Sequence, residues 1–182
     1  MIHVITPFSR PQNILALVEH LRPAGIIWHP LHHGLVDFPK EPWIQPRQIG
    51  YPNEWLATGA CCYWKVNQFI DDGLEDGDYY GVLCDDDMYA LGFWDKFRTH
   101  SGDIIVASLE HTSLNTLVAA PENMKQGRVS FEQMFAKAHI WNEFRYNNDC
   151  QADGNLIERV HQRYADKFDY APECFVMFNL LR

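Results

Sequence analysis

The first 32 residues carry the pattern that limits the fold most. A β-prone run at residues 2–6 is followed by apolar residues at helical spacing, and then by a second β-prone run at residues 25–32. The apolar positions of the helical segment are Ile14, Leu17, Val18 and Leu21. They fall at i, i+3, i+4 and i+7, which is one face of a helix. A strand–helix–strand unit of this kind needs a crossover, and such crossovers join parallel strands. We therefore predict an α/β fold with a mostly parallel central sheet flanked by helices.

The rest of the chain alternates in the same way. Further strands are expected at residues 79–84, 103–108, 116–120 and 174–178, and further helices at about residues 55–70, 89–98, 134–141 and 156–168. Ser9 with Gln12, and Ser130 with Gln133, have the spacing of a capping box, so each pair predicts a helix start. Residues 33–52 are expected to form a long loop or lid. With no repeat or linker, residues 1–182 predict a single domain.

Three consecutive aspartates end the apolar run that begins at Tyr79. We term Asp85, Asp86 and Asp87 the aspartate triplet. In open parallel sheets, ligands bind at the edge where the strands' carboxyl ends lie. Adjacent carboxylates repel one another unless a cation neutralises them, and Mg²⁺ and Mn²⁺ prefer oxygen ligands that they share with phosphates. The triplet therefore predicts a metal–phosphate site. The alternative is an acidic turn that caps the next helix, but a cap needs only one aspartate.

Composition excludes several classes of function. The net charge of −9 argues against a nucleic-acid partner, which normally meets a basic surface. The five cysteines form no CxxC pair, so neither a disulfide framework nor a zinc knuckle is expected. No apolar run is long enough for a membrane span, and the first strand is too short for the core of a signal peptide. We expect a cytoplasmic protein.

Two motifs together resemble a known family. One is Thr6-Pro7-Phe8-Ser9-Arg10-Pro11 after the first strand, and the other is the approach from Gly77 through Tyr79-Tyr80-Gly81-Val82-Leu83-Cys84 into the triplet. In sequence and spacing they are similar to GT-A-fold nucleotide-sugar glycosyltransferases with a DxD motif, and the family-2-like members are closest. The resemblance covers roughly residues 1–110. It implies a GT-A-like (Rossmann-like) domain.

The resemblance also implies a reaction and its residues. The enzyme would move a sugar from a nucleoside-diphosphate donor, expected to be UDP-linked, to a sugar or glycan acceptor, with inversion. Mn²⁺ or Mg²⁺ would neutralise the departing diphosphate. Asp87 would be the direct metal ligand, Asp85 would assist it, and Asp85 and Asp86 would bind the nucleotide sugar. The other nucleotide-binding residues implied are Thr6, Pro7, Arg10, Lys65 and Asn67.

An inverting transfer also needs a carboxylate that takes the acceptor's proton. Family members often place it in a late loop, which here contains Asp149 and Asp153. Asp153 is preferred because Gly154 beside it permits a tight turn. Two other functions stay open. One is a nucleotidyl or pyrophosphoryl transferase, although no Gly-rich basic loop follows the first strand. The other is a non-catalytic binding module, in which a partner or a homo-oligomer would complete the acceptor site.

Overall fold

The computed structural model describes residues 1–57, 60–111 and 116–181, with His111 described by its backbone alone. Eight strands form one sheet in the order β3-β2-β1-β4-β7-β6-β8-β5. The strands are β1 (Ile2–Pro7), β2 (Ile27–His32), β3 (Arg47–Gln48), β4 (Tyr79–Val82), β5 (Met88–Tyr89), β6 (Ile104–His111), β7 (Met134–Lys137) and β8 (Phe168–Phe178). The α-helices are α1 (Ile14–Leu21), α2 (Asn53–Ala57), α3 (Cys61–Asp71), α4 (Phe93–Phe97), α5 (Ala138–Glu143) and α6 (Ala152–Tyr164). Short 3₁₀ turns are η1 (Pro11–Asn13), η2 (Arg22–Ala24), η3 (Pro121–Asn123), η4 (Phe131–Gln133) and η5 (Ala165–Lys167).

The predicted mixed α/β domain with a mostly parallel sheet is confirmed. Strand β1 pairs in parallel with β2 on one side and with β4 on the other, and β2 continues in parallel to β3. Strand β6 is parallel to β8, whereas β7 lies antiparallel between β4 and β6, and β5 is antiparallel to β8. After β1 the chain therefore turns first to the β2 side and later to the β4 side. The gap between the carboxyl ends of β1 and β4 is a topological switch point.

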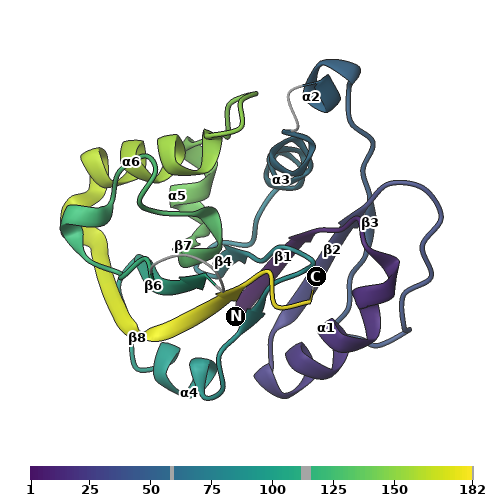
Figure 1. The fold of residues 1–182 in the computed structure, drawn as a ribbon, viewed down its shortest axis with the longest axis horizontal. Helices are drawn as coiled ribbons and strands as arrows, with labels where there is room; N and C mark the ends of the chain where they lie inside the picture. Colours follow the sequence, from purple (N-terminus) through teal and green to yellow (C-terminus); the bar gives the residue numbers. More distant parts are fainter. Residues whose placement is uncertain (58–59, 112–115, 182) are drawn as a thin grey trace.

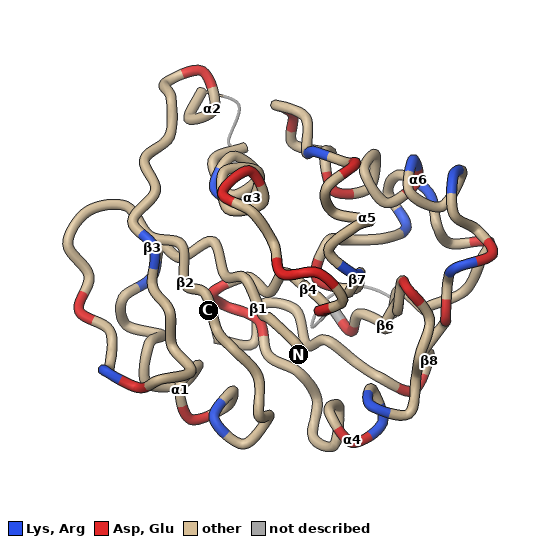
Figure 2. Tube along the Cα trace, turned by 180° about the vertical axis from the view of Figure 1, so that it is seen from behind, with Lys and Arg blue, Asp and Glu red and all other residues tan. Residues whose placement is uncertain are grey.

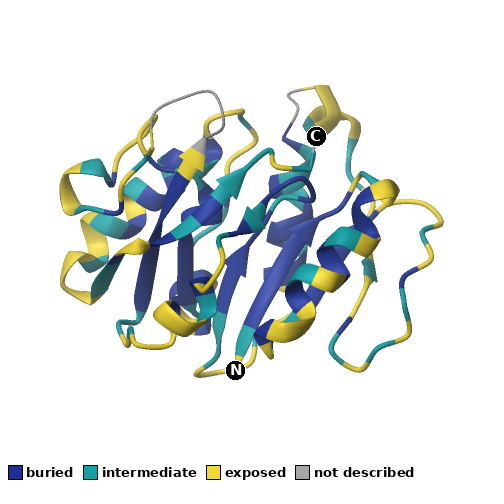
Figure 3. Cartoon of the chain, turned by 60° about the horizontal axis from the view of Figure 1, so that its bottom comes forward, coloured by how far each residue is buried: buried dark blue, intermediate teal, exposed yellow. Residues whose placement is uncertain are grey.

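Helices cover both faces of the sheet, with α1 and α4 on one side and α3, α5 and α6 on the other (Figure 1). Successive side chains of a strand point to opposite faces, so each strand contributes to two cores. Val4 packs with the α1 and α4 residues, and its neighbour Ile5 packs with the α3, α5 and α6 residues. Ile105 and Ile104 of β6 divide in the same way. Figure 3 shows the result: most of the sheet is buried, and α1 exposes only its outer face.

Two of the expected helix starts differ from the structure. Ser130 and Gln133 do form the capping box, but it heads the single turn η4, and the helix expected from Met134 is the strand β7. Met134 and its neighbour Phe135 are both fully buried because β7 lies between β4 and β6, and a run buried on both faces does not show strand alternation. Ser9 caps no helix, because its backbone N–H and hydroxyl group donate to Asp85 instead.

Three other element boundaries are corrected. The helix expected at residues 55–70 is divided into α2 and α3, and Gly59, which belonged to its pattern, lies outside the described residues. The helix expected at residues 89–98 begins as β5, and only Phe93–Phe97 are α-helical, after a left-handed Gly92 (φ 75°). The strand expected at residues 116–120 is reduced to one bridge between Leu117 and Leu109. In the described part of the chain, none of the helices has both the length and the apolar character needed to cross a membrane.

Candidate functional site

The aspartate triplet lies at the switch point of the sheet, where the loop after β1 meets the loop after β4. The carboxylate of Asp85, almost completely buried, accepts hydrogen bonds from Ser9 N (2.5 Å), Ser9 Oγ (3.0 Å) and Arg10 N (2.7 Å). The guanidinium of Arg10 also donates to it, and Asn13 Nδ2 donates to the Asp85 carbonyl at 2.8 Å. Asp85 therefore holds the β1 loop against the β4 loop, and both of its carboxylate oxygens have donors.

Asp86 and Asp87 are bound differently. Arg10 Nη2 lies 3.3 Å from Asp86 Oδ2, so one guanidinium connects Asp85 and Asp86. Asp87 Oδ1 accepts from the backbone N–H of Asn179 at 2.7 Å, and the Asp86 carbonyl accepts from Leu181 N at 2.9 Å. Residues 179–181 thus lie against Asp86 and Asp87, and the buried Oδ2 atom of Asp87 has no hydrogen-bond partner among the described residues.

A second carboxylate, Glu132, lies beside Asp87 and was not identified from the sequence. It is buried in η4, directly before β7, and β7 pairs with β4. Burial and repulsion from Glu132 raise the pKa of Asp87 from 3.8 to about 8. Burial likewise raises the pKa of Glu132 from 4.5 to about 7. Near neutral pH the two side chains therefore retain at least part of a proton that free carboxyl groups would release.

Asp153 joins this group through Ser130, but it lies in the first turn of α6 and not in the late loop expected from the sequence, so Gly154 forms no tight turn beside it. The Ser130 hydroxyl lies within hydrogen-bonding distance of Glu132 and, at 3.2 Å, of Asp153 Oδ2. A hydroxyl group has one proton to donate, so one of the two carboxyl groups must itself be protonated when both contacts are made. Burial raises the pKa of Asp153, which agrees with a shared proton. The carboxyl groups of Asp87, Glu132 and Asp153 thus form a continuous series, which we term the buried acid group.

Aromatic side chains enclose the Asp153 end of the buried acid group. The Tyr63 hydroxyl lies near Asp153 and lowers the pKa of Asp153, in opposition to burial, and the Tyr63 ring stacks on Tyr146 with centroids 5.0 Å apart. Tyr146 is nearly fully buried, and its hydroxyl has no partner among the described residues. An apolar wall of this kind lowers the local dielectric and strengthens the repulsion among the carboxylates.

The other residues predicted for the site divide into two sets. Lys65 Nζ donates to the Phe8 carbonyl at 3.1 Å, which places it under the β1 loop; burial lowers its pKa, and the nearby Asp85 opposes that shift. Arg10, Lys65, the triplet and Asp153 are therefore brought to one region. The other predicted residues, Thr6, Pro7, Asn67 and Asp149, contact the surrounding scaffold.

Thr6 Oγ1 accepts from Trp28 Nε1 at 2.9 Å inside the sheet, and Pro7 is the buried last residue of β1. The Asn67 side chain exchanges two hydrogen bonds of 2.9 Å with the backbone of Tyr146. Asp149 Oδ1 accepts from Gln151 N at 2.8 Å, a local bond before α6. These hydrogen bonds of Thr6, Asn67 and Asp149 hold the scaffold together.

The donor set beside the triplet can accommodate a hard cation. Ligand atoms of Cys84, Asp86 and Asp87 lie within 4.8 Å of one another. Burial raises the pKa of the Cys84 thiol well above its usual value, and the nearby Glu132 raises it further, so Cys84 stays protonated. The carboxylates of Asp86 and Asp87 remain as oxygen ligands, the type that Mg²⁺ and Mn²⁺ prefer. The buried Oδ2 of Asp87, without a partner, is the feature that a cation would satisfy.

Comparison with known proteins adds no family. No protein-family model matches the chain, and no curated protein sequence matches it.

Charged residues lie on many elements of the described chain. In Figure 2 the acidic positions are found on many elements, including a run between α3 and β4, and Lys and Arg are scattered among them.

Proposed function

We propose that the chain is a metal-dependent glycosyltransferase of GT-A-like fold, which moves a sugar from a nucleoside-diphosphate donor, UDP-linked by preference, to a sugar or glycan acceptor. The observation that supports it is the position of Arg10 and the aspartate triplet at the switch point between β1 and β4. Ligands of open α/β sheets bind in this position. A cytoplasmic location belongs to the same proposal.

Each side chain near the triplet has a role in this proposal. Asp87, with Oδ2 unsatisfied, and Asp86 would hold Mn²⁺ or Mg²⁺, which when bound supplies Lewis-acid stabilisation of the departing diphosphate. Asp85 already accepts four donors, so it would act by holding Arg10 in place rather than as a metal ligand. The Arg10 guanidinium, partly exposed, would face the donor's phosphate oxygens, for which its planar fork is suited.

The buried acid group supplies a candidate for the general base. A base works best when its pKa is near the working pH, and burial raises the pKa of Glu132 to about 7. Ser130 connects Glu132 to Asp153, the residue preferred from the sequence. We propose that the two carboxyl groups act together, with one taking the acceptor's proton while the other stays protonated. Inversion at the anomeric carbon follows from a single displacement assisted by such a base.

One observation favours a second candidate, a non-catalytic binding module. Residues 179–181 lie over Asp86 and Asp87 and donate two backbone hydrogen bonds to them. A donor could reach the triplet only if this segment moved away. If the segment stays in place under all conditions, a transferase-like fold would serve to bind a partner without catalysis.

Donor turnover distinguishes the candidates. Incubation with UDP- and GDP-sugars and Mn²⁺, followed by proton NMR of the released sugar, would detect slow hydrolysis and give the anomer formed first. Glu132→Gln and Asp153→Asn should reduce the rate at least about tenfold, since general-base catalysis contributes about 10²–10⁴. Asp149→Asn, which changes a carboxylate in the loop before α6 that accepts a local hydrogen bond from Gln151 N, should leave the rate unchanged. Release of pyrophosphate from a nucleoside triphosphate and a sugar phosphate would instead favour the nucleotidyl transferase.

A further inference from the structure

Strand β8 contains a bulge that nothing at the triplet explains. Its pairing with β6 advances from Ala107 opposite Ala171 directly to Ser108 opposite Phe175. Pro172, Glu173 and Cys174 therefore have no partner on β6, and we term these three residues the β8 bulge. Ser108 Oγ donates to the Pro172 carbonyl at 3.0 Å and holds the bulge in place. Bulges often serve to re-aim a side chain toward a site.

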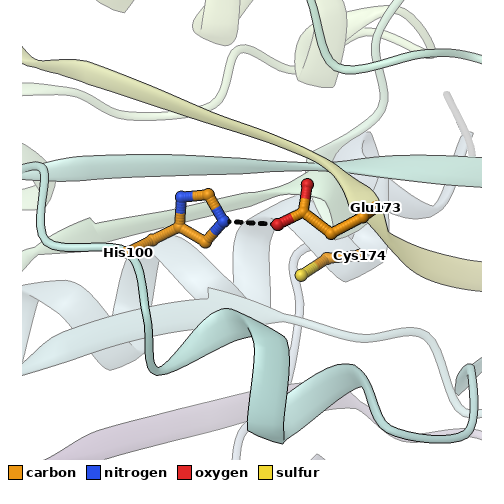
Figure 4. A group of neighbouring side chains, drawn as sticks. All are labelled: His100, Glu173 and Cys174. Carbon is orange, nitrogen blue, oxygen red and sulfur yellow. Dashed lines mark hydrogen bonds and ion pairs between the residues drawn. The ribbon is translucent and has the colours of Figure 1, made fainter.

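The β8 bulge presents two side chains to His100, which follows α4. His100 Nε2 lies 2.9 Å from Glu173 Oε1, and its ring points at that carboxylate (Figure 4). The Cys174 sulfur lies on the same side, below the carboxylate. One ligand atom from each of His100, Glu173 and Cys174 can be chosen so that all three are within 4.8 Å of one another. Imidazole nitrogen, thiolate sulfur and carboxylate oxygen are the three ligand types that Zn²⁺ takes in proteins.

The second ring nitrogen of His100 also has a carboxylate partner. His100 Nδ1 lies 2.8 Å from Asp169 Oδ1. The other oxygen of Asp169 accepts from the backbone N–H groups of Ser101 (3.0 Å) and Gly102 (3.4 Å). A Cβ at Gly102 would lie 2.7 Å from Asp169 Cβ, so this close approach requires glycine. A carboxylate that orients a histidine through its second nitrogen is the usual outer partner of a zinc-binding histidine.

We propose that His100, Glu173 and Cys174 form a binding site for a transition-metal cation, Zn²⁺ by preference, with Asp169 as the positioning residue. The mixed N, S and O donors distinguish it from the hard-cation site at the triplet. A water molecule would complete the tetrahedral set, since Glu173 is exposed while Cys174 is buried. The positive charge of Lys96 lies nearby and opposes a cation here, and Lys96 Nζ donates to the Glu173 carbonyl at 3.2 Å.

A cation in this position would join the end of α4 to the middle of β8. Beyond the bulge, β8 pairs with β5, and β5 directly follows Asp87 in the sequence. Strand β8 is then followed by Asn179, whose backbone N–H donates to Asp87. The site would therefore act structurally, by fixing the strand that ends over the triplet. This inference does not depend on the proposed transferase activity, because its ligands are separate from Asp86 and Asp87.

Cobalt substitution tests the site directly. Co²⁺ bound to a thiolate gives a charge-transfer absorption band, and Zn²⁺ should abolish that band by competition. The probe ions are Co²⁺ and Zn²⁺ alone, added to the full chain under reducing conditions. Cys174→Ser should lose the band, whereas Cys150→Ser, an exposed cysteine that serves as the matched control, should keep it. Asp169→Asn keeps every ligand and should weaken Zn²⁺ binding by about 10- to 100-fold.

The outcomes are distinct. One equivalent of Zn²⁺, a cobalt band lost only with Cys174→Ser, and weakened binding in Asp169→Asn would support the proposal. A band that persists in Cys174→Ser would assign the thiolate to another cysteine and overturn it. No stoichiometric Zn²⁺ binding by the wild-type chain would overturn it as well. If Cys174→Ser fails to fold, Asp169→Asn decides alone, and unchanged affinity in that variant would refute the site.

Discussion

Replacing Asp87 by Asn should stabilise the folded chain at pH 8. Burial, with repulsion from Glu132, raises the pKa of Asp87 from 3.8 to about 8. Between about pH 4 and pH 8 the unfolded chain releases a proton that the folded chain retains. The unfolded state then binds fewer protons, so the free energy of unfolding falls as pH rises through this window. Asn has no proton to lose, and its Oδ1 can still accept from Asn179 N, 2.7 Å from the present oxygen.

The magnitude follows from the shift. Each pKa unit corresponds to about 1.4 kcal/mol, so a rise of about 4 units, from 3.8 to about 8, limits the gain at pH 8 to about 6 kcal/mol. Glu132 shares protons with Asp87, and the wild-type site can relax when Asp87 ionises. We therefore expect Asp87→Asn to raise the free energy of unfolding by about 1–3 kcal/mol at pH 8. The gain should be smaller at pH 5, because the pH then lies closer to the pKa of the unfolded carboxyl group.

Urea unfolding at pH 5 and pH 8 measures this difference. Asp149→Asn serves as the matched control, because the hydrogen bond that the Asp149 carboxylate accepts is a local one, from Gln151 N. In the control, the free energy of unfolding should differ from the wild type by the same small amount at both pH values. The proposed proton sharing would be refuted if Asp87→Asn were less stable than the wild type at pH 8. It would also be refuted if the stability difference between Asp87→Asn and the wild type were the same at pH 5 and pH 8.

Three further perturbations test other parts of the structure. Gly81→Ala places a Cβ 2.2 Å from Phe135 Cε1 in the sheet interior, so thermal unfolding should show a loss of about 1–3 kcal/mol or more, and wild-type stability would contradict this packing. Asn67→Ala leaves the buried N–H and C=O of Tyr146 unsatisfied, and we expect a loss of about 2–4 kcal/mol in urea unfolding; a loss below about 0.5 kcal/mol would mean that water replaces the amide. Deletion of residues 179–182 removes the cover over Asp87, so Mn²⁺-dependent UDP affinity, measured by titration, should rise; an unchanged affinity would show that the cover does not restrict access.

Local patterns were sufficient for the first 32 residues of the fold. The strand–helix–strand unit of β1, α1 and β2 depends on spacing within a short stretch, so it was predicted with its parallel pairing. The position of the aspartate triplet after β4 followed for the same reason. Lys65 and Arg10 were expected near the nucleotide, and the structure brings both to the β1 loop beside Asp85.

The parts that escaped prediction depend on contacts between distant residues. Met134 and Phe135 belong to a strand only because β4 and β6 lie on either side of them. Glu132 was not singled out from the sequence, because only the pairing of β7 with β4 places it beside Asp87. The one indication in the sequence that Glu132 is buried is its position between apolar Phe131 and the apolar run that begins at Met134. The β8 bulge was likewise not predicted from the sequence, because a bulge is defined by the pairing with a neighbouring strand, here β6.

The most direct test of the central claim is calorimetric titration of UDP, and then GDP, into the protein with Mn²⁺, repeated with a chelator. The proposal predicts binding of one nucleotide that disappears with the chelator and with Asp87→Ala, and that persists in Asp149→Asn. Absence of binding by the folded wild-type chain, or binding that survives both the chelator and Asp87→Ala, would contradict a metal–diphosphate site at the aspartate triplet.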